Sequence, residues 1–152
     1  MRSTIISDTS CLILLEKIGE LEVLHQLFGT ITTTQEVANE YGLPLPHWFE
    51  IKHPIDKDYL KIIEQTVDKG EASAIALAVE TENSLLIIDE QKGRKLAKEL
   101  GLPFTGTMGI LLEAKFAGIL PSIKPILLRI RSTNFRISEQ LELLLLKKAG
   151  EV

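Results

Sequence analysis

Short apolar or β-branched segments alternate with segments of helical periodicity along the chain, and this alternation constrains the fold more than any other feature. The segments that predict strands are residues 4–7, 30–33, 49–52, 84–88 and 104–105. The segments that predict helices are residues 12–18, 21–28, 35–41, 58–67, 70–80, 91–100, 108–116, 121–130 and 138–148. Strands that alternate with helices form a mostly parallel sheet with helices on both faces. The sequence therefore predicts an α/β fold, and its 152 residues predict one domain over 1–152.

Carboxylates directly follow two of the predicted strands. Asp8 comes after the strand at 4–7, and Asp89 and Glu90 come after the strand at 84–88, which is apolar from Leu85 to Ile88. In parallel α/β sheets, ligands bind beyond the carboxyl ends of the strands. If these two strands are neighbours, we expect their acids to meet at one edge of the sheet.

Three further glutamates lie on predicted helices, and two of them, Glu71 and Glu36, are in a first turn. Glu71 opens the alanine-rich helix, and Glu36 and Glu40 lie one turn apart on the short helix at 35–41. Several carboxylates in one cleft repel each other unless a cation lies between them. Oxygen ligands suit magnesium or manganese, whereas the three histidines show no spacing typical of a zinc site.

Several of these acids also have a purely structural interpretation. Asp8 or Ser10 is a suitable N-cap for the helix that follows. Glu36 fits a capping box with Thr33, three residues earlier. Glu71 is favoured at a helix start by the helix dipole. The joint placement of the acids is therefore stronger evidence for a metal site than any one of them.

Net charge and cysteine content restrict the partners and the compartment. The formal net charge of −4 gives no global electrostatic reason to expect nucleic acid. The single cysteine, Cys11, excludes an internal disulfide and fits a reducing compartment. No segment has the features of a signal peptide or of a membrane span. We expect a cytoplasmic protein that does not associate with a membrane.

A local basic segment follows Asp89 along the predicted helix at 91–100. Its cations are Lys92, Arg94, Lys95 and Lys98. Arg94 is the candidate to contact a phosphate, because its planar fork suits bidentate binding. A solvated helix face explains the same pattern equally well.

Specific stretches of the sequence resemble the PIN domain, the small metal-dependent nuclease fold of VapC-type toxin ribonucleases. The strand-end "DTS", the "GEA" that opens a helix, and "IDEQKGRKLA" followed by "TGTMGILL" carry most of the resemblance. Together with longer flanking stretches, it covers nearly the whole chain, and it is strongest to short single-domain prokaryotic PIN-like proteins. The resemblance implies a three-layer α/β/α sandwich around a central, mostly parallel sheet.

The resemblance also implies roles for individual residues. Asp8, Glu40, Glu71 and Asp89 would be the catalytic, metal-binding acids. Glu40 is preferred over Glu36 because the family glutamate falls three positions after a valine, here Val37.

One strand end departs from the family pattern. Many PIN ribonucleases carry a threonine, any residue and then an acid there, whereas this chain has Ile88, Asp89 and Glu90. Either acid could be the ligand, and we favour Asp89. Ser10, which shapes the turn after Asp8, and Arg94 are the substrate-binding candidates.

The implied activity is hydrolysis of RNA phosphodiester bonds with Mg²⁺ or Mn²⁺. The toxin relatives make an antitoxin protein a candidate partner. The alternative is a PIN-like module that binds nucleic acid or protein without cutting. A receiver-like or phosphatase-like α/β domain fits less well, because Asp8 stands alone after its strand. The four leucines at 143–146 exceed one buried stripe, so we also expect a homodimer.

Overall fold

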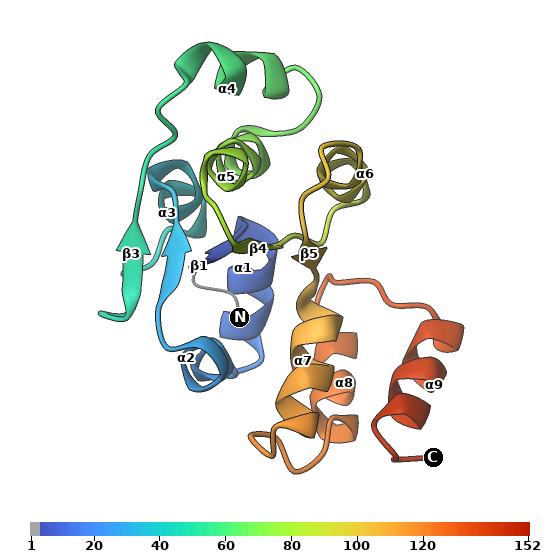
Figure 1. The fold of residues 1–152 in the computed structure, drawn as a ribbon. Coiled ribbons are helices and arrows are strands. Elements are labelled where there is room, and N and C mark those ends of the chain that lie inside the picture. The colour runs from blue at the N-terminus through green and yellow to red at the C-terminus, as the bar shows by residue number, and fades with distance from the viewer. Residues whose placement is uncertain (1–3) are drawn as a thin grey trace.

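The computed structural model describes residues 4–152 and contains one five-stranded sheet in which every strand pair is parallel (Figure 1). The strand order is β3-β2-β1-β4-β5. The strands are β1 (Thr4–Ser7), β2 (Ile31–Thr33), β3 (Phe49–Ile51), β4 (Ser84–Ile87) and β5 (Phe104–Thr105). This arrangement confirms the predicted parallel sheet, with β1 beside β4 at its centre.

Nine helices occur within residues 4–152 and cover both faces of the sheet. They are α1 (Thr9–Lys17), α2 (Glu22–Phe28), α3 (Gln35–Tyr41), α4 (Lys57–Ile63), α5 (Lys69–Glu80), α6 (Gln91–Glu99), α7 (Thr107–Phe116), α8 (Lys124–Arg131) and α9 (Glu139–Lys148). Within this described range, no helix is both long enough and apolar enough to span a bilayer.

Successive residues of the central strands face different hydrophobic cores, as the two-residue period of a strand requires. Ile5 and Ile87 belong to one core with residues of α1, α2, α3, α7, α8 and α9, whereas Ile6 and Leu86 belong to a second core with residues of α4, α5 and α6. Figure 1 shows α4, α5 and α6 on one side of the sheet and α2, α7, α8 and α9 on the other. The protein is therefore a three-layer α/β/α sandwich, as the resemblance implies.

The start of α8 differs from the sequence prediction for a reason that lies far along the chain. The helix begins at Lys124 rather than at residue 121. The Glu151 carboxylate accepts hydrogen bonds from the N–H groups of Ile123 and Lys124 and from Ser122 Oγ. A side chain near the C-terminus therefore satisfies the first donors of α8.

The predicted capping box of Thr33 and Glu36 is wrong. The N-cap of α3 is Thr34, whose hydroxyl accepts a hydrogen bond from the N–H of Val37. Thr33 is the last residue of β2, and its hydroxyl donates to the carbonyl of Ser7. The structural explanation that the sequence offered for Glu36 therefore does not apply.

Candidate metal centre

Asp8 and Asp89 lie at the carboxyl ends of the adjacent central strands β1 and β4. Asp8 is fully buried and caps α1, because its Oδ1 accepts a hydrogen bond from the N–H of Cys11 at 3.2 Å. Its Oδ2 accepts a second hydrogen bond, also of 3.2 Å, from the N–H of Asp89. The capping interpretation of Asp8 is thus correct, and it coexists with a position beside another acid.

The environment of Asp8 favours its neutral form. Burial and the nearby Asp89 carboxylate raise the pKa of Asp8 well above its ordinary value, and Glu71 adds to this effect. The hydrogen bonds from the amides of Cys11 and Asp89 lower the pKa but do not offset the increase. A cation beside Asp8 would reverse the balance by favouring the carboxylate.

Thr107 orients the Asp89 side chain. The N–H of Thr107 donates to Asp89 Oδ1 at 2.8 Å, and its hydroxyl donates to Oδ2 at 2.6 Å. Thr107 is the first residue of α7 and is fully buried. Thr107 lies within the family-like stretch "TGTMGILL", but the resemblance alone implies no role for it.

Glu71 is a buried carboxylate whose charge is poorly compensated. It lies in the first turn of α5, 7% exposed, and its Oε2 is buried without a hydrogen-bond partner among residues 4–152. Burial raises the pKa of Glu71 to about 7, and the carboxylates of Asp68 and Glu90 add to the increase. A β-carbon on Gly93 would lie 2.9 Å from Oε2 of Glu71. A residue larger than glycine at position 93 would therefore crowd this oxygen.

Glu40 reaches from α3 to the first turns of α1 and α5. Its Oε1 accepts a hydrogen bond of 2.6 Å from the Thr9 hydroxyl, directly beside Asp8 in the sequence. A β-carbon on Gly70 would lie only 1.9 Å from the same oxygen, so the side chain passes over the place where α5 has no side chain. Glu40 therefore extends toward the residues around Asp8 and Glu71.

The acids lie near one another at this edge of the sheet, but their oxygens are not arranged as a coordination shell. Within residues 4–152, no group of three or more His, Cys, Asp or Glu side chains is arranged to hold a metal ion. Asp8, Asp89 and Glu40 are each held by hydrogen-bond donors of their own. The unpaired Glu71 oxygen and the raised pKa values nevertheless fit a site whose negative charge a hard cation would offset.

A family model described as a PIN domain matches residues 4–151. The chain belongs to the PIN-domain family. PIN domains have a nuclease-type fold, are generally nucleases and typically use divalent metal ions. The search of curated proteins finds no match to this chain.

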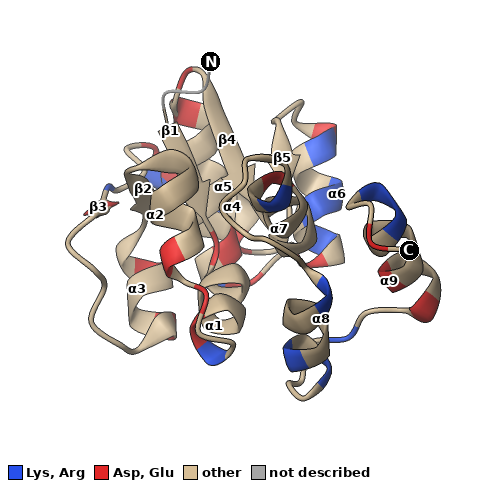
Figure 2. Ribbon diagram, turned by 90° about the horizontal axis from the view of Figure 1, so that it is seen from below, with Lys and Arg blue, Asp and Glu red and all other residues tan. Residues whose placement is uncertain are grey.

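The two predicted substrate-binding residues of this PIN domain lie in different surroundings. Ser10 lines a cleft together with Asp89 and Glu90. The Arg94 guanidinium lies over the ring of Phe104, 5.1 Å from its centroid, and Nη1 makes a long hydrogen bond of 3.5 Å to the carbonyl of Ile88. Figure 2 shows the other basic residues of α6 along the same helix.

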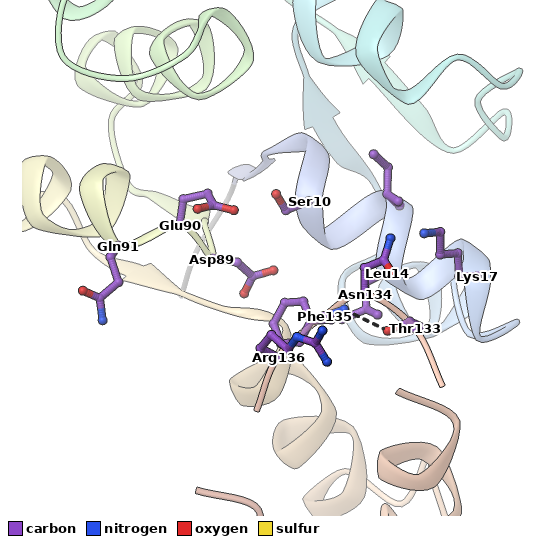
Figure 3. A pocket seen from close by; sticks show the side chains of 11 residues that line it. Ser10, Leu14, Lys17, Asp89, Glu90, Gln91, Thr133, Asn134, Phe135 and Arg136 are labelled. Atoms are coloured by element: carbon purple, nitrogen blue, oxygen red, sulfur yellow. Dashed lines mark hydrogen bonds between the residues drawn. The ribbon is translucent and has the colours of Figure 1, made fainter. Parts of the chain in front are cut away.

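A second group of residues at the cleft was missed by sequence analysis. The cleft has a volume of about 470 Å³ and is also lined by Lys17 of α1 and by residues 133–136, which follow α8 (Figure 3). The spacing of residues along the chain gives no sign that this segment lies beside the end of β4. The signal in the sequence was the family-like stretch "FRISEQLELLLLKKAGE", which begins at Phe135, but no role was assigned to its residues.

Proposed function

We propose that this PIN domain is a Mg²⁺- or Mn²⁺-dependent endoribonuclease that hydrolyses RNA phosphodiester bonds at the carboxyl edge of its sheet. The proposed metal ligands and catalytic residues are Asp8, Glu40, Glu71 and Asp89, with Glu90 as the alternative to Asp89. The observation that carries the proposal is the hydrogen-bonded pair of Asp8 and Asp89, with the unpaired oxygen of Glu71 among the nearby acids.

The bound cation would activate water and offset the charge that develops on the phosphoryl oxygens. The residues of the chain would orient the acids that bind the cation. Thr107 holds Asp89 through two hydrogen bonds, backbone amides hold Asp8, and Thr9 holds Glu40. These donors orient acids that lie after two strand ends and in the last turn of α3, as precise placement of ligands requires.

The test is cleavage of single-stranded RNA by the purified protein. We expect slow cleavage in Mg²⁺ or Mn²⁺, none in chelator, and none by Asp8→Asn or Asp89→Asn. Asp58→Asn is the matched control, because Asp58 is an exposed acid on α4. Cleavage that survives both site substitutions would contradict the proposed active site.

The second candidate function is a PIN-like module that binds nucleic acid or a protein without cutting. Ile88 at the strand end where many relatives have threonine favours it, as does the lack of a ready group of three ligands in the described chain. Protein that binds RNA but shows neither metal binding nor cleavage would establish this alternative.

A toxin role and a homodimer complete the proposal. A toxin requires an antitoxin protein, and co-purification of a protein encoded next to this one would identify it.

On α9, Leu143 and Leu144 are exposed while Leu145 is buried, which leaves an apolar surface for a second copy. Sedimentation of the wild type against a Leu143→Glu, Leu144→Glu variant tests the dimer.

A further inference from the structure

We propose that the cleft between α1 and residues 133–136 binds a nucleotide of single-stranded RNA adjacent to the scissile phosphate. This inference deepens the proposed function and rests on it. Asp89 and Glu90 line one side of the cleft, and Lys17 and Arg136 line it from other elements (Figure 3). The cleft thus joins the candidate metal centre to a surface that sequence analysis did not assign.

The positively charged side chains of the cleft suit the phosphate backbone of a nucleic acid strand. Lys17 and Arg136 are exposed, and neither forms an ion pair within the described part of the chain. An RNA strand with one phosphate at the acids and their cation would bring a neighbouring phosphate within reach of these two side chains. Arginine and lysine contacts to phosphate provide most of the sequence-independent affinity for nucleic acid.

Phe135 provides an aromatic surface in the same cleft. Its side chain is partly buried against the core, and its N–H donates a hydrogen bond of 3.1 Å to Thr133 Oγ1. The Thr133 hydroxyl in turn donates to the carbonyl of Ile130 at 2.7 Å, at the end of α8. The hydrogen bonds therefore hold the backbone of this segment, packing against the core supports the ring, and a base can stack on the part of the ring that is exposed.

Trp48, the one tryptophan in the sequence, does not serve this purpose. Trp48 is buried, with its ring stacked between those of His25 and Phe49 at centroid distances of 4.9 and 4.6 Å. Asn134, by contrast, is exposed and lines the cleft beside Phe135. Its amide can both donate and accept hydrogen bonds at the edge of an unpaired base, which is how single-stranded RNA is commonly read.

The experiment measures RNA binding separately from cleavage. A labelled single-stranded oligoribonucleotide is titrated with protein in chelator at several salt concentrations, and fluorescence anisotropy gives Kd. The test variant is Lys17→Gln with Arg136→Gln. The control variant is Lys124→Gln with Lys147→Gln, which removes the same charge from exposed positions on α8 and α9 that do not line the cleft.

We expect the test variant to weaken binding by about tenfold or more and to reduce the slope of log K against log salt by about 1.4, which corresponds to two lost phosphate contacts. The control variant should match the wild type. Phe135→Leu should weaken binding by about tenfold at an unchanged slope, and Phe135→Tyr should restore it. Melting curves confirm that each variant is folded.

Equal binding by the test and control variants would overturn the proposed cleft, as would a wild type that binds no RNA. Failure of the nuclease proposal has a different result. In that case the test variant would still lose affinity, but the wild type would cleave no RNA in Mg²⁺ or Mn²⁺.

Discussion

The N–H of Asp89 donates a hydrogen bond to Oδ2 of Asp8 and joins the ends of two adjacent parallel strands. The second oxygen of Asp8 caps α1 through the N–H of Cys11. One buried carboxylate therefore ties a strand, a helix and the neighbouring strand end together at the place where the acids gather. This double role separates the effects of two substitutions at Asp8.

Asp8→Asn removes the cost of burying a charge, but it keeps only one of the two acceptor oxygens. The two effects on the free energy of unfolding therefore nearly cancel. We expect its free energy of unfolding in chelator at neutral pH to lie within about 1 kcal/mol of the wild type. Asp8→Ala loses both acceptors and should be less stable than Asp8→Asn by about 2 kcal/mol. Urea denaturation of the two variants checks this. Equal destabilisation by both would mean that the acceptor oxygen kept by asparagine does not stabilise the fold.

The raised pKa of Glu71 predicts that the stability of the metal-free protein depends on pH. Its pKa rises from 4.5 to about 7 on folding, so the folded state binds the proton more tightly than the unfolded state. The free energy of unfolding should therefore fall by about 3 kcal/mol as pH increases from about 4.5 through about 7, and this contribution should stay lost at higher pH.

Unfolding by urea in chelator across this pH range measures the effect. Glu71→Gln should flatten the profile in part, since the raised pKa of Asp8 acts in the same direction. The exposed Glu99→Gln on α6 is the control and should keep the wild-type profile. An unchanged profile in Glu71→Gln would show that the Glu71 carboxyl is not strained by burial.

Thr107→Val tests the orientation of Asp89. The variant keeps the volume and the backbone N–H but loses the hydroxyl that donates to Asp89 Oδ2. We expect kcat for RNA cleavage to fall by about tenfold, because one lost hydrogen bond to a charged group is worth about 1.5 kcal/mol or more. Thr107→Ser retains the donor and should remain close to wild type. Equal rates of cleavage by the valine and serine variants would show that the Thr107 hydroxyl does not contribute to activity.

Gly70→Ala tests Glu40 without removing its carboxylate. The added methyl group would lie 1.9 Å from Glu40 Oε1, so the flexible glutamate must move away from Thr9. Alanine in α5 should hold or raise stability, because it favours a helix over glycine by about 0.5 to 1 kcal/mol. We expect a stable protein with lost cleavage activity, similar to Glu40→Gln. Full activity in both variants would exclude Glu40 as a ligand.

Local sequence patterns predicted most of the fold. The apolar pairs Ile5-Ile6 of β1 and Leu85-Leu86 of β4, with Ile87 and Ile88 after the second pair, stand out because a strand covered on both faces is mainly apolar. The bounds of α3 were also predicted, since Gly42, in the left-handed conformation that ends the helix, is visible in the sequence.

Features that depend on distant residues were not predicted. The start of α8 depends on Glu151, and the role of Thr33 depends on the carbonyl of Ser7 across the sheet. At the site, the strand-end rule brought Asp8 and Asp89 together. Only tertiary packing shows that residues 133–136 line the same cleft, because no spacing along the chain relates this segment to the ends of β1 and β4.

The most direct test of the proposed metal centre is calorimetric titration of the metal-free protein with Mn²⁺. We predict that the wild type and Asp58→Asn bind the ion, and that Asp8→Asn and Asp89→Asn lose most of this binding, because each removes a charged ligand from a site that needs several. Binding that is absent from the wild type, or that is equal in the wild type and Asp8→Asn, would contradict a metal-dependent active site at this edge of the sheet.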